Sequence, residues 1–158
     1  MCGDALIADA LNALARAGLD GEIRAHAHAV NELSIFSPGR VEVRLPGSFL
    51  TIRRIDLDER LRLAAVRAGA AFETARVETV AAVPAAGGVR ITVAGRPEPL
   101  SARVAVLATG ADVSLASGHG MVSRRAASAA ALRCYVRAPV DLPRLVISYD
   151  RAIVPGYA

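Results

Sequence analysis

The sequence predicts a mixed α/β fold, because segments with helical spacing and extended segments share its 158 residues. Apolar residues recur at helical intervals over residues 5–17 and again over 58–68. Hydrophobic residues make up 53% of the chain and charged residues 22%, a composition that favours a packed domain over a disordered segment. Alternating or continuous apolar stretches, typical of strands, cover residues 41–45, 49–52, 72–80, 89–93 and 104–108.

The first predicted element is a helix over residues 5–17. Asp4 stands directly before it as a candidate N-cap, since a short carboxylate accepts hydrogen bonds from the free N–H groups of a first helical turn. Gly18 is placed to end the helix as a C′ residue. The apolar positions with helical spacing are Leu6, Ile7, Ala10, Leu11 and Leu14.

A β-hairpin is predicted next. Val41, Val43 and Leu45 alternate with charged residues, Pro46-Gly47 indicates a turn, and residues 49–52 resume an extended pattern.

A second helix is predicted over 58–68. Asp56 and Asp58 are alternative caps, and Gly69 marks its end.

The second half of the sequence predicts further strands. Residues 72–80, 89–93 and 104–108 read as a meander, and the continuous apolar run 104–108 is typical of a strand buried on both faces. Residues 109–128, rich in Gly, Ser and Ala, predict a loop. Residues 131–137 and 145–149 are then expected to form strands of a further sheet.

The charge pattern argues against nucleic-acid binding. The net charge is +4, but all 19 basic residues are arginines, and they are spread along the chain instead of clustered. Aromatic residues, which stack on bases, amount to 4%. We attribute the absence of lysine to genomic base composition, and we expect no nucleic-acid partner.

Cysteine usage argues against a structural metal site, and hydropathy indicates the cellular location of the protein. Cys2 and Cys134 are far apart in the sequence, and no His or Cys residues have metal-ligand spacing, so neither a disulfide framework nor a zinc site is expected. The sequence shows no leader peptide and no apolar stretch of spanning length. We therefore predict a cytoplasmic protein without a transmembrane segment, and leave a peripheral position at the membrane open.

Three segments are candidates for ligand binding, each with a plain structural alternative. Gly3 and Asp4 precede a predicted helix, whose free N–H groups attract anions, although a simple cap at Asp4 and a turn at Gly3 explain these residues without a ligand. Arg54, between a strand and a helix, has the donor geometry for a phosphate or an adenine edge, or it pairs with Asp56 or Asp58. Residues 107–112 follow a predicted strand, where α/β sheets bind ligands, or they form an ordinary turn.

Taken together and in this order, these segments resemble the geranylgeranyl reductase family of FAD-dependent oxidoreductases, relatives of the aromatic-hydroxylase-type flavoproteins. C-G-D-A-L at 2–6 is similar to the family's C-G-D-[GA]-L, and R-x-x-L-D-x-x-L at 54–61 to its R-x-x-F-D-x-x-L, with Leu in place of Phe. The remaining matches are A-G-A at 68–70, L-A-T-G-A-D at 107–112 and P-G-Y at 155–157.

The resemblance implies an FAD site and a hydrophobic substrate. It implies reduction of C=C bonds in a polyprenyl chain, or oxidation of a hydrophobic small molecule, with NAD(P)H or another electron donor. The flavin performs the hydride chemistry, so the resemblance identifies no catalytic side chain. Tyr157 would line the substrate pocket, with an apolar core role as the alternative. The implied cofactor-binding residues are Cys2, Gly3, Asp4, Arg54, Gly110, Ala111 and Asp112.

The departures from the family predict a partial domain. A G-x-G-x-x-G phosphate loop precedes C-G-D in the family, whereas Met1 does so here, and Val113 replaces the usual Gly. We therefore expect a partial Rossmann-like FAD-binding domain with a β-meander over 1–128, and the beginning of an antiparallel substrate-domain sheet over 129–158. The alternatives are a non-catalytic truncated chain, or a subunit that needs a partner to complete the flavin site, and a basic module for nucleic acid or anionic lipid.

Overall fold

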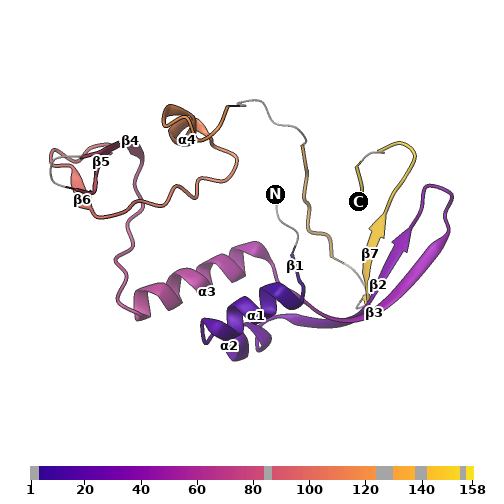
Figure 1. Ribbon diagram of the computed structural model, residues 1–158. Coiled ribbons are helices and arrows are strands. Elements are labelled where there is room, and N and C mark those ends of the chain that lie inside the picture. Colours follow the sequence, from indigo (N-terminus) through magenta and orange to yellow (C-terminus); the bar gives the residue numbers. More distant parts are fainter. Residues whose placement is uncertain (1–3, 84–86, 124–129, 138–141, 154–155) are drawn as a thin grey trace. The chain divides into compact units, whose positions relative to one another are not determined.

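The computed structural model describes residues 4–83, 87–123, 130–137, 142–153 and 156–158. They form two compact units, one made of residues 1–71 and 134–158 and the other of 72–133. Helices and two separate sheets occur together, so the predicted mixed α/β fold is confirmed. Figure 1 shows the elements, and each unit is described by itself below.

The first unit contains a four-stranded sheet with the order β1-β3-β2-β7. Its strands are β1 (Ala5–Leu6), β2 (His28–Phe36), β3 (Glu42–Thr51) and β7 (Leu145–Ser148). β1 and β2 run antiparallel to β3, whereas β7 runs parallel to β2. The segment 145–149, expected in a further sheet, thus adds to the sheet of the first unit through β7.

The predicted turn at Pro46-Gly47 is wrong. β3 runs unbroken through both residues, and the hairpin pairs it with β2, a strand that the sequence reading missed. The register slips between Val30, opposite Phe49, and Glu32, opposite Pro46, so these residues lie at a β-bulge. A bulge tolerates proline because its N–H need not join the ladder. Gly47 fits because a Cβ there would lie 2.5 Å from the Phe49 ring.

Both predicted helices exist with shifted starts. α1 spans Ala8–Arg16, not 5–17, and Gly18 ends it with a φ of 71°. Asp4 is therefore not its N-cap, because residues 5–6 form β1 and Ile7 takes the cap position.

The second helix, α3, spans Arg54–Arg67 and begins four residues earlier than predicted. Asp56 and Asp58 thus lie inside the helix, and Arg53 is at the cap position. Gly69 follows its end with a φ of 97°. A short helix that was not predicted, α2 (Asp20–Arg24), lies between α1 and β2.

The core of the first unit lies where the helices meet the β1 end of the sheet. Buried apolar side chains come from β1, α1, α2, the end of β3 and α3. Ile23 of α2 is 1% exposed, the most buried of them. The members of this cluster are Leu6, Leu11, Leu14, Ile23, Leu50, Ile52 and Leu57.

The second unit contains the predicted meander with a different third strand. β4 (Val77–Ala82), β5 (Val89–Val93) and β6 (Leu100–Ala102) form an antiparallel sheet, and the short helix α4 covers Ser114–Gly118. The expected buried strand over 104–108 is wrong. Those residues form no strand, and Val104 and Val106 are 74% and 84% exposed. An apolar run becomes a buried strand only when neighbouring strands pair with it and layers cover it.

The expected strand over 131–137 is also absent, since these residues have no regular secondary structure. The division into an FAD-binding part over 1–128 and a substrate part from 129 stays a prediction. Among the described residues, no helix combines the length and the apolarity that crossing a bilayer requires.

Candidate functional site

Asp4 joins three segments of the first unit that are distant in sequence. Its backbone carbonyl accepts a hydrogen bond from the Ile52 N–H at 3.0 Å, which extends the pairing of β1 with β3. Its carboxylate Oδ1 accepts the backbone N–H of Arg54 at 3.2 Å. The same oxygen lies 3.3 Å from the hydroxyl of Tyr135. Asp4 thus caps α3, 50 residues further along the chain, and not the helix over 5–17 for which it was predicted.

Arg54 lies at the start of α3 with part of its guanidinium group engaged. Nη2 donates to Oδ1 of Asp58 at 2.6 Å, one helical turn later. The side chain is 36% exposed. The sequence left open a pair with Asp56 or Asp58, and the structure identifies Asp58. The structure shows no bond from Nε or Nη1 of Arg54 to the described residues.

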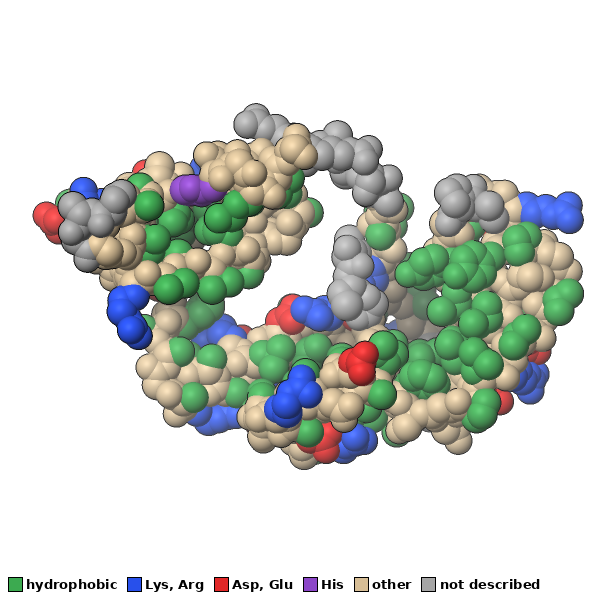
Figure 2. All heavy atoms as spheres, in the orientation of Figure 1, with side chains coloured by type: hydrophobic (Ala, Val, Ile, Leu, Met, Phe, Trp, Pro, Cys, Tyr) green, Lys and Arg blue, Asp and Glu red, His purple; other side chains and the backbone are tan. Residues whose placement is uncertain are grey.

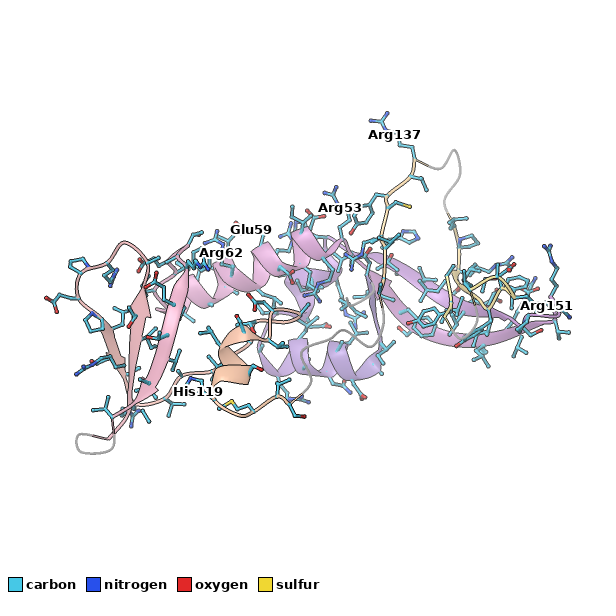
Figure 3. All side chains as sticks on the ribbon, turned by 90° about the horizontal axis from the view of Figure 1, so that it is seen from above. Arg53, Glu59, Arg62, His119, Arg137 and Arg151 are labelled. Carbon is cyan, nitrogen blue, oxygen red and sulfur yellow. The ribbon has the colours of Figure 1, made fainter. Side chains whose placement is uncertain are left out.

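The neighbouring charges on α3 are paired with one another. Arg53 binds Asp56 through Nε at 2.6 Å and Nη2 at 3.1 Å, and this bidentate hydrogen bond lowers the pKa of Asp56. Arg62 forms a similar pair with Glu59. Figure 3 labels Arg53, Glu59 and Arg62 along this helix. Arg54 therefore differs from Arg53 and Arg62, because its carboxylate partner occupies only one of its nitrogens.

The turn at 109–112 lies in the second unit. Gly110 has a φ of 62°, a left-handed conformation that favours glycine, and the Asp112 N–H donates to the Thr109 carbonyl at 3.3 Å. Asp112 Oδ1 accepts hydrogen bonds from the Ser114 hydroxyl at 2.6 Å and from its N–H at 3.0 Å. These bonds favour the ionised carboxylate and lower the pKa of Asp112.

A hollow open to solvent is lined by Ala111, Asp112, Val113 and Ser114. The predicted residues Ala111 and Asp112 thus border a concave surface. The turn follows no strand, so the expectation that it lies at the carboxyl end of a buried strand is wrong.

Tyr157 lies on the surface of the first unit. It is 67% exposed, and its ring centroid is 5.8 Å from that of Tyr149 with the planes tilted by 53°. The core role, weighed as the alternative for this tyrosine, is therefore wrong. Ala158 next to it exchanges two backbone hydrogen bonds with Ser148, which holds this end of the chain against β7.

The structure thus joins two of the predicted segments, at Asp4 and Arg54. Gly110, Ala111 and Asp112 belong to the other unit and form a group of their own. Cys2 and Gly3 lie outside the described residues. The contact of Tyr135 with Asp4 was not predicted. Tyr135 follows Cys134 and belongs to no motif in the sequence, so motif spacing could not have linked it to Asp4.

The fold is similar to parts of two solved enzymes, a flavin-dependent brominase and a p-nitrophenol 4-monooxygenase. A triple mutant of the flavin-dependent brominase Bmp2 matches 77% of this chain with a TM-score of 0.59 and 20% identity, and Bmp2 itself matches 66% with 0.52 and 20%. The p-nitrophenol 4-monooxygenase PnpA from Pseudomonas putida DLL-E4 matches 63% with 0.52 and 13% identity. At these identities the likeness concerns the fold.

The matched regions cover 32%, 27% and 28% of those three chains, so this chain spans about a third of their length or less. No protein-family model matches the sequence. No curated protein matches it either.

Proposed function

We propose that this chain forms part of an FAD-dependent oxidoreductase that acts on a hydrophobic small molecule. The contact between the Asp4 carboxylate and the Arg54 N–H is the observation that carries the proposal. It brings together two segments on which the resemblance to geranylgeranyl reductases rests. The likeness of the fold to a flavin-dependent brominase supports the same class of enzyme.

The residues at the start of α3 fit one edge of a dinucleotide. Arg54 has Nε and Nη1 available for a phosphate oxygen or an adenine nitrogen, and the positive end of α3 favours an anion nearby. Asp4 fixes the geometry, because its carboxylate holds the first N–H of α3 against β1. FAD would supply the hydride transfer, while these residues bind and orient it.

The turn in the second unit supplies further residues of the proposed cofactor-binding set. Gly110 allows close backbone approach, and Asp112, whose lowered pKa keeps it ionised, is fixed by Ser114. Cys2 and Gly3 complete the proposed cofactor set. Residues 1–128 would then belong to the FAD-binding domain and 129–158 to the substrate domain.

The proposed substrate is a polyprenyl chain whose C=C bonds are reduced, with NAD(P)H or another donor as the source of electrons. Oxidation of a hydrophobic small molecule is the alternative reaction class. The likeness of the fold to a brominase and a monooxygenase supports this alternative. Tyr157, exposed beside Tyr149, is the proposed substrate contact.

An FAD titration of the chain, followed by quenching of flavin fluorescence, tests the proposal. We expect saturable binding that weakens about 10-fold in Arg54→Gln, because a charge-assisted hydrogen bond is lost. Arg62→Gln is the matched control, since Arg62 also pairs with a carboxylate on α3. Absence of binding by the unaltered chain, or equal affinities of both variants, contradicts the proposal.

The second candidate function is a non-catalytic subunit that needs a partner to complete the flavin site. The exposure of Val104 and Val106 favours it, because an apolar extended segment is suited to pairing with an added strand. A purified chain that is colourless and remains free of flavin after addition of FAD would support this candidate.

A further inference from the structure

The sheet of the first unit has one apolar face and one mixed face, on which Phe36 and Val146 lie among charged and polar residues. Cross-strand partners point to the same side, and three strands contribute only aliphatic residues to one side. Tyr149 follows in the same alternation, with its N–H bonded to the Phe36 carbonyl at 2.9 Å. Figure 2 shows hydrophobic side chains gathered over β2, β3 and β7. The aliphatic residues of this face are Leu33, Ile35, Val43, Leu45, Leu145 and Ile147.

The opposite face carries an ion-pair network. Glu42 binds Arg44 at 3.0 Å, and Arg144 lies 3.7 Å from Glu32 and 3.9 Å from Glu42. Ser34 between them is fully buried. These charges compensate one another, so the apolar face is the side of the sheet that is open to a hydrophobic partner.

Two turns lie together at the end of the sheet that is remote from the core. β2 and β7 are parallel, so the turn after each strand lies at the same end. The turn after β2 carries Arg40, and the turn after β7 carries Arg151, which Figure 3 labels at this end of the sheet. Figure 1 shows the helices packed at the other end.

We call this region the sheet tip and define it as Arg40, Val41, Val43, Tyr149, Arg151, Ile153 and Tyr157. Its apolar side chains are well exposed, with Val41 at 64% and Tyr157 at 67%. Neither arginine forms an ion pair with any residue that the structure describes. Asp150 is the acid in the second turn, and it bonds the Ala152 N–H at 2.8 Å.

We propose that the sheet tip is a docking surface for a lipid bilayer with anionic headgroups. Exposed aliphatic residues would enter the headgroup boundary, and tyrosines are side chains typical of that boundary. The arginines would bind lipid phosphates, because two positive charges against one carboxylate leave an excess of positive charge. A second copy of the chain carries the same charges and would be repelled by them, whereas an anionic bilayer attracts them.

This surface does not depend on the flavin proposal, since it shares only Tyr157 with that site. Sedimentation with phosphatidylcholine vesicles, with and without phosphatidylglycerol, tests it on the full chain. We expect binding to the anionic vesicles and little to the neutral ones, with a loss of binding as salt screens the charges.

Removing both charges as Arg40→Gln with Arg151→Gln is expected to lower the partition coefficient roughly 30-fold, at about fivefold for each arginine. The matched control is Arg16→Gln with Arg103→Gln, which removes two exposed arginines elsewhere. Val41→Ser should weaken binding several-fold, whereas Val104→Ser, at a valine that is even more exposed, should not. Circular dichroism verifies that each variant is folded.

Three results would overturn the proposal. The first is equal binding to neutral and anionic vesicles. The second is an equal loss of vesicle binding in the Arg40/Arg151 double variant and in its control. The third is a stable dimer in sedimentation velocity that does not bind vesicles. The last result would identify a second copy as the occupant of the sheet tip.

Discussion

The cap that Asp4 provides to α3 leads to a quantitative prediction. Asp4→Ala removes the acceptor for the Arg54 N–H, held at 3.2 Å, and leaves that N–H without its partner at a half-buried position. Loss of a capping side chain costs about 0.5–2 kcal/mol, typically near 1. The backbone bond from the Ile52 N–H to the Asp4 carbonyl persists, so β1 should remain paired. The hydroxyl of Tyr135, 57% exposed as a residue, adds little because water replaces Asp4.

Urea unfolding followed by circular dichroism measures the effect. We expect the free energy of unfolding of Asp4→Ala to fall by about 1–1.5 kcal/mol with an unchanged m-value. Asp4→Asn should fall by about 0.5 kcal/mol or less, because an amide oxygen still accepts the bond and only the charge at the positive helix end is lost. Glu98→Ala, which removes an exposed acid from the second unit, is the control.

Equal stability of Asp4→Ala and the control would refute the reasoning. It would mean that the contact between β1 and α3 does not stabilise the unit. A larger loss in Asp4→Asn than in Asp4→Ala would also refute it, since the capping argument orders the two variants the other way.

Three further outcomes are expected. Ile23→Ala, at the most buried side chain of the core cluster, should lower the free energy of unfolding by about 2–5 kcal/mol in the same urea assay, and a loss below that of an exposed substitution would contradict the core assignment. Gly88→Ala should destabilise the second unit by more than about 1 kcal/mol, because φ is 105° and a Cβ would lie 2.5 Å from the Ala102 carbonyl oxygen; an unchanged melting curve would count against the pairing of β5 with β6. Ser114→Ala should raise the pKa of Asp112 in a carboxyl NMR titration, since its main hydrogen bond is lost. In the unaltered chain this lowered pKa stabilises the fold above the unfolded pKa of Asp112, and the stabilisation is lost as the pH falls through the folded value, so an identical titration in both proteins would be the contrary result.

The sequence predicted elements where a local signal sufficed. The apolar spacing of α1 and the glycines at 18 and 69 placed the ends of both helices well. The start of α1 was misplaced because β1 is a two-residue strand, fixed by its pairing with β3 instead of any pattern of its own. The start of α3 was predicted four residues too late for a similar reason, because the Asp4 carboxylate that caps this helix lies 50 residues earlier in the sequence.

Non-local pairing also explains the missed strand and the false one. The apolar residues Val30, Leu33 and Ile35 of β2 do not keep a single alternation along the strand, so the two-residue pattern that indicates a strand is missing. The run at 104–108 has the composition of a buried strand but is exposed, which composition cannot reveal.

The candidate site was predictable in part for the same reasons. Motif spacing brought Asp4 and Arg54 together in the prediction, although it gave Asp4 the wrong helix. Tyr135 reaches Asp4 from 131 residues away, a separation at which a single sequence carries no signal. The place of Tyr157 beside Tyr149 depends on how the chain folds back on β7, and that too is a tertiary contact.

The central claim is that the start of α3 in the first unit binds the dinucleotide FAD. An NMR titration of the 15N-labelled chain with FAD tests it most directly. The account predicts that the amide signals of Asp4 and Arg54 shift together and saturate with one dissociation constant. Shifts confined to other residues, or shifts of these two signals that do not saturate, would contradict it.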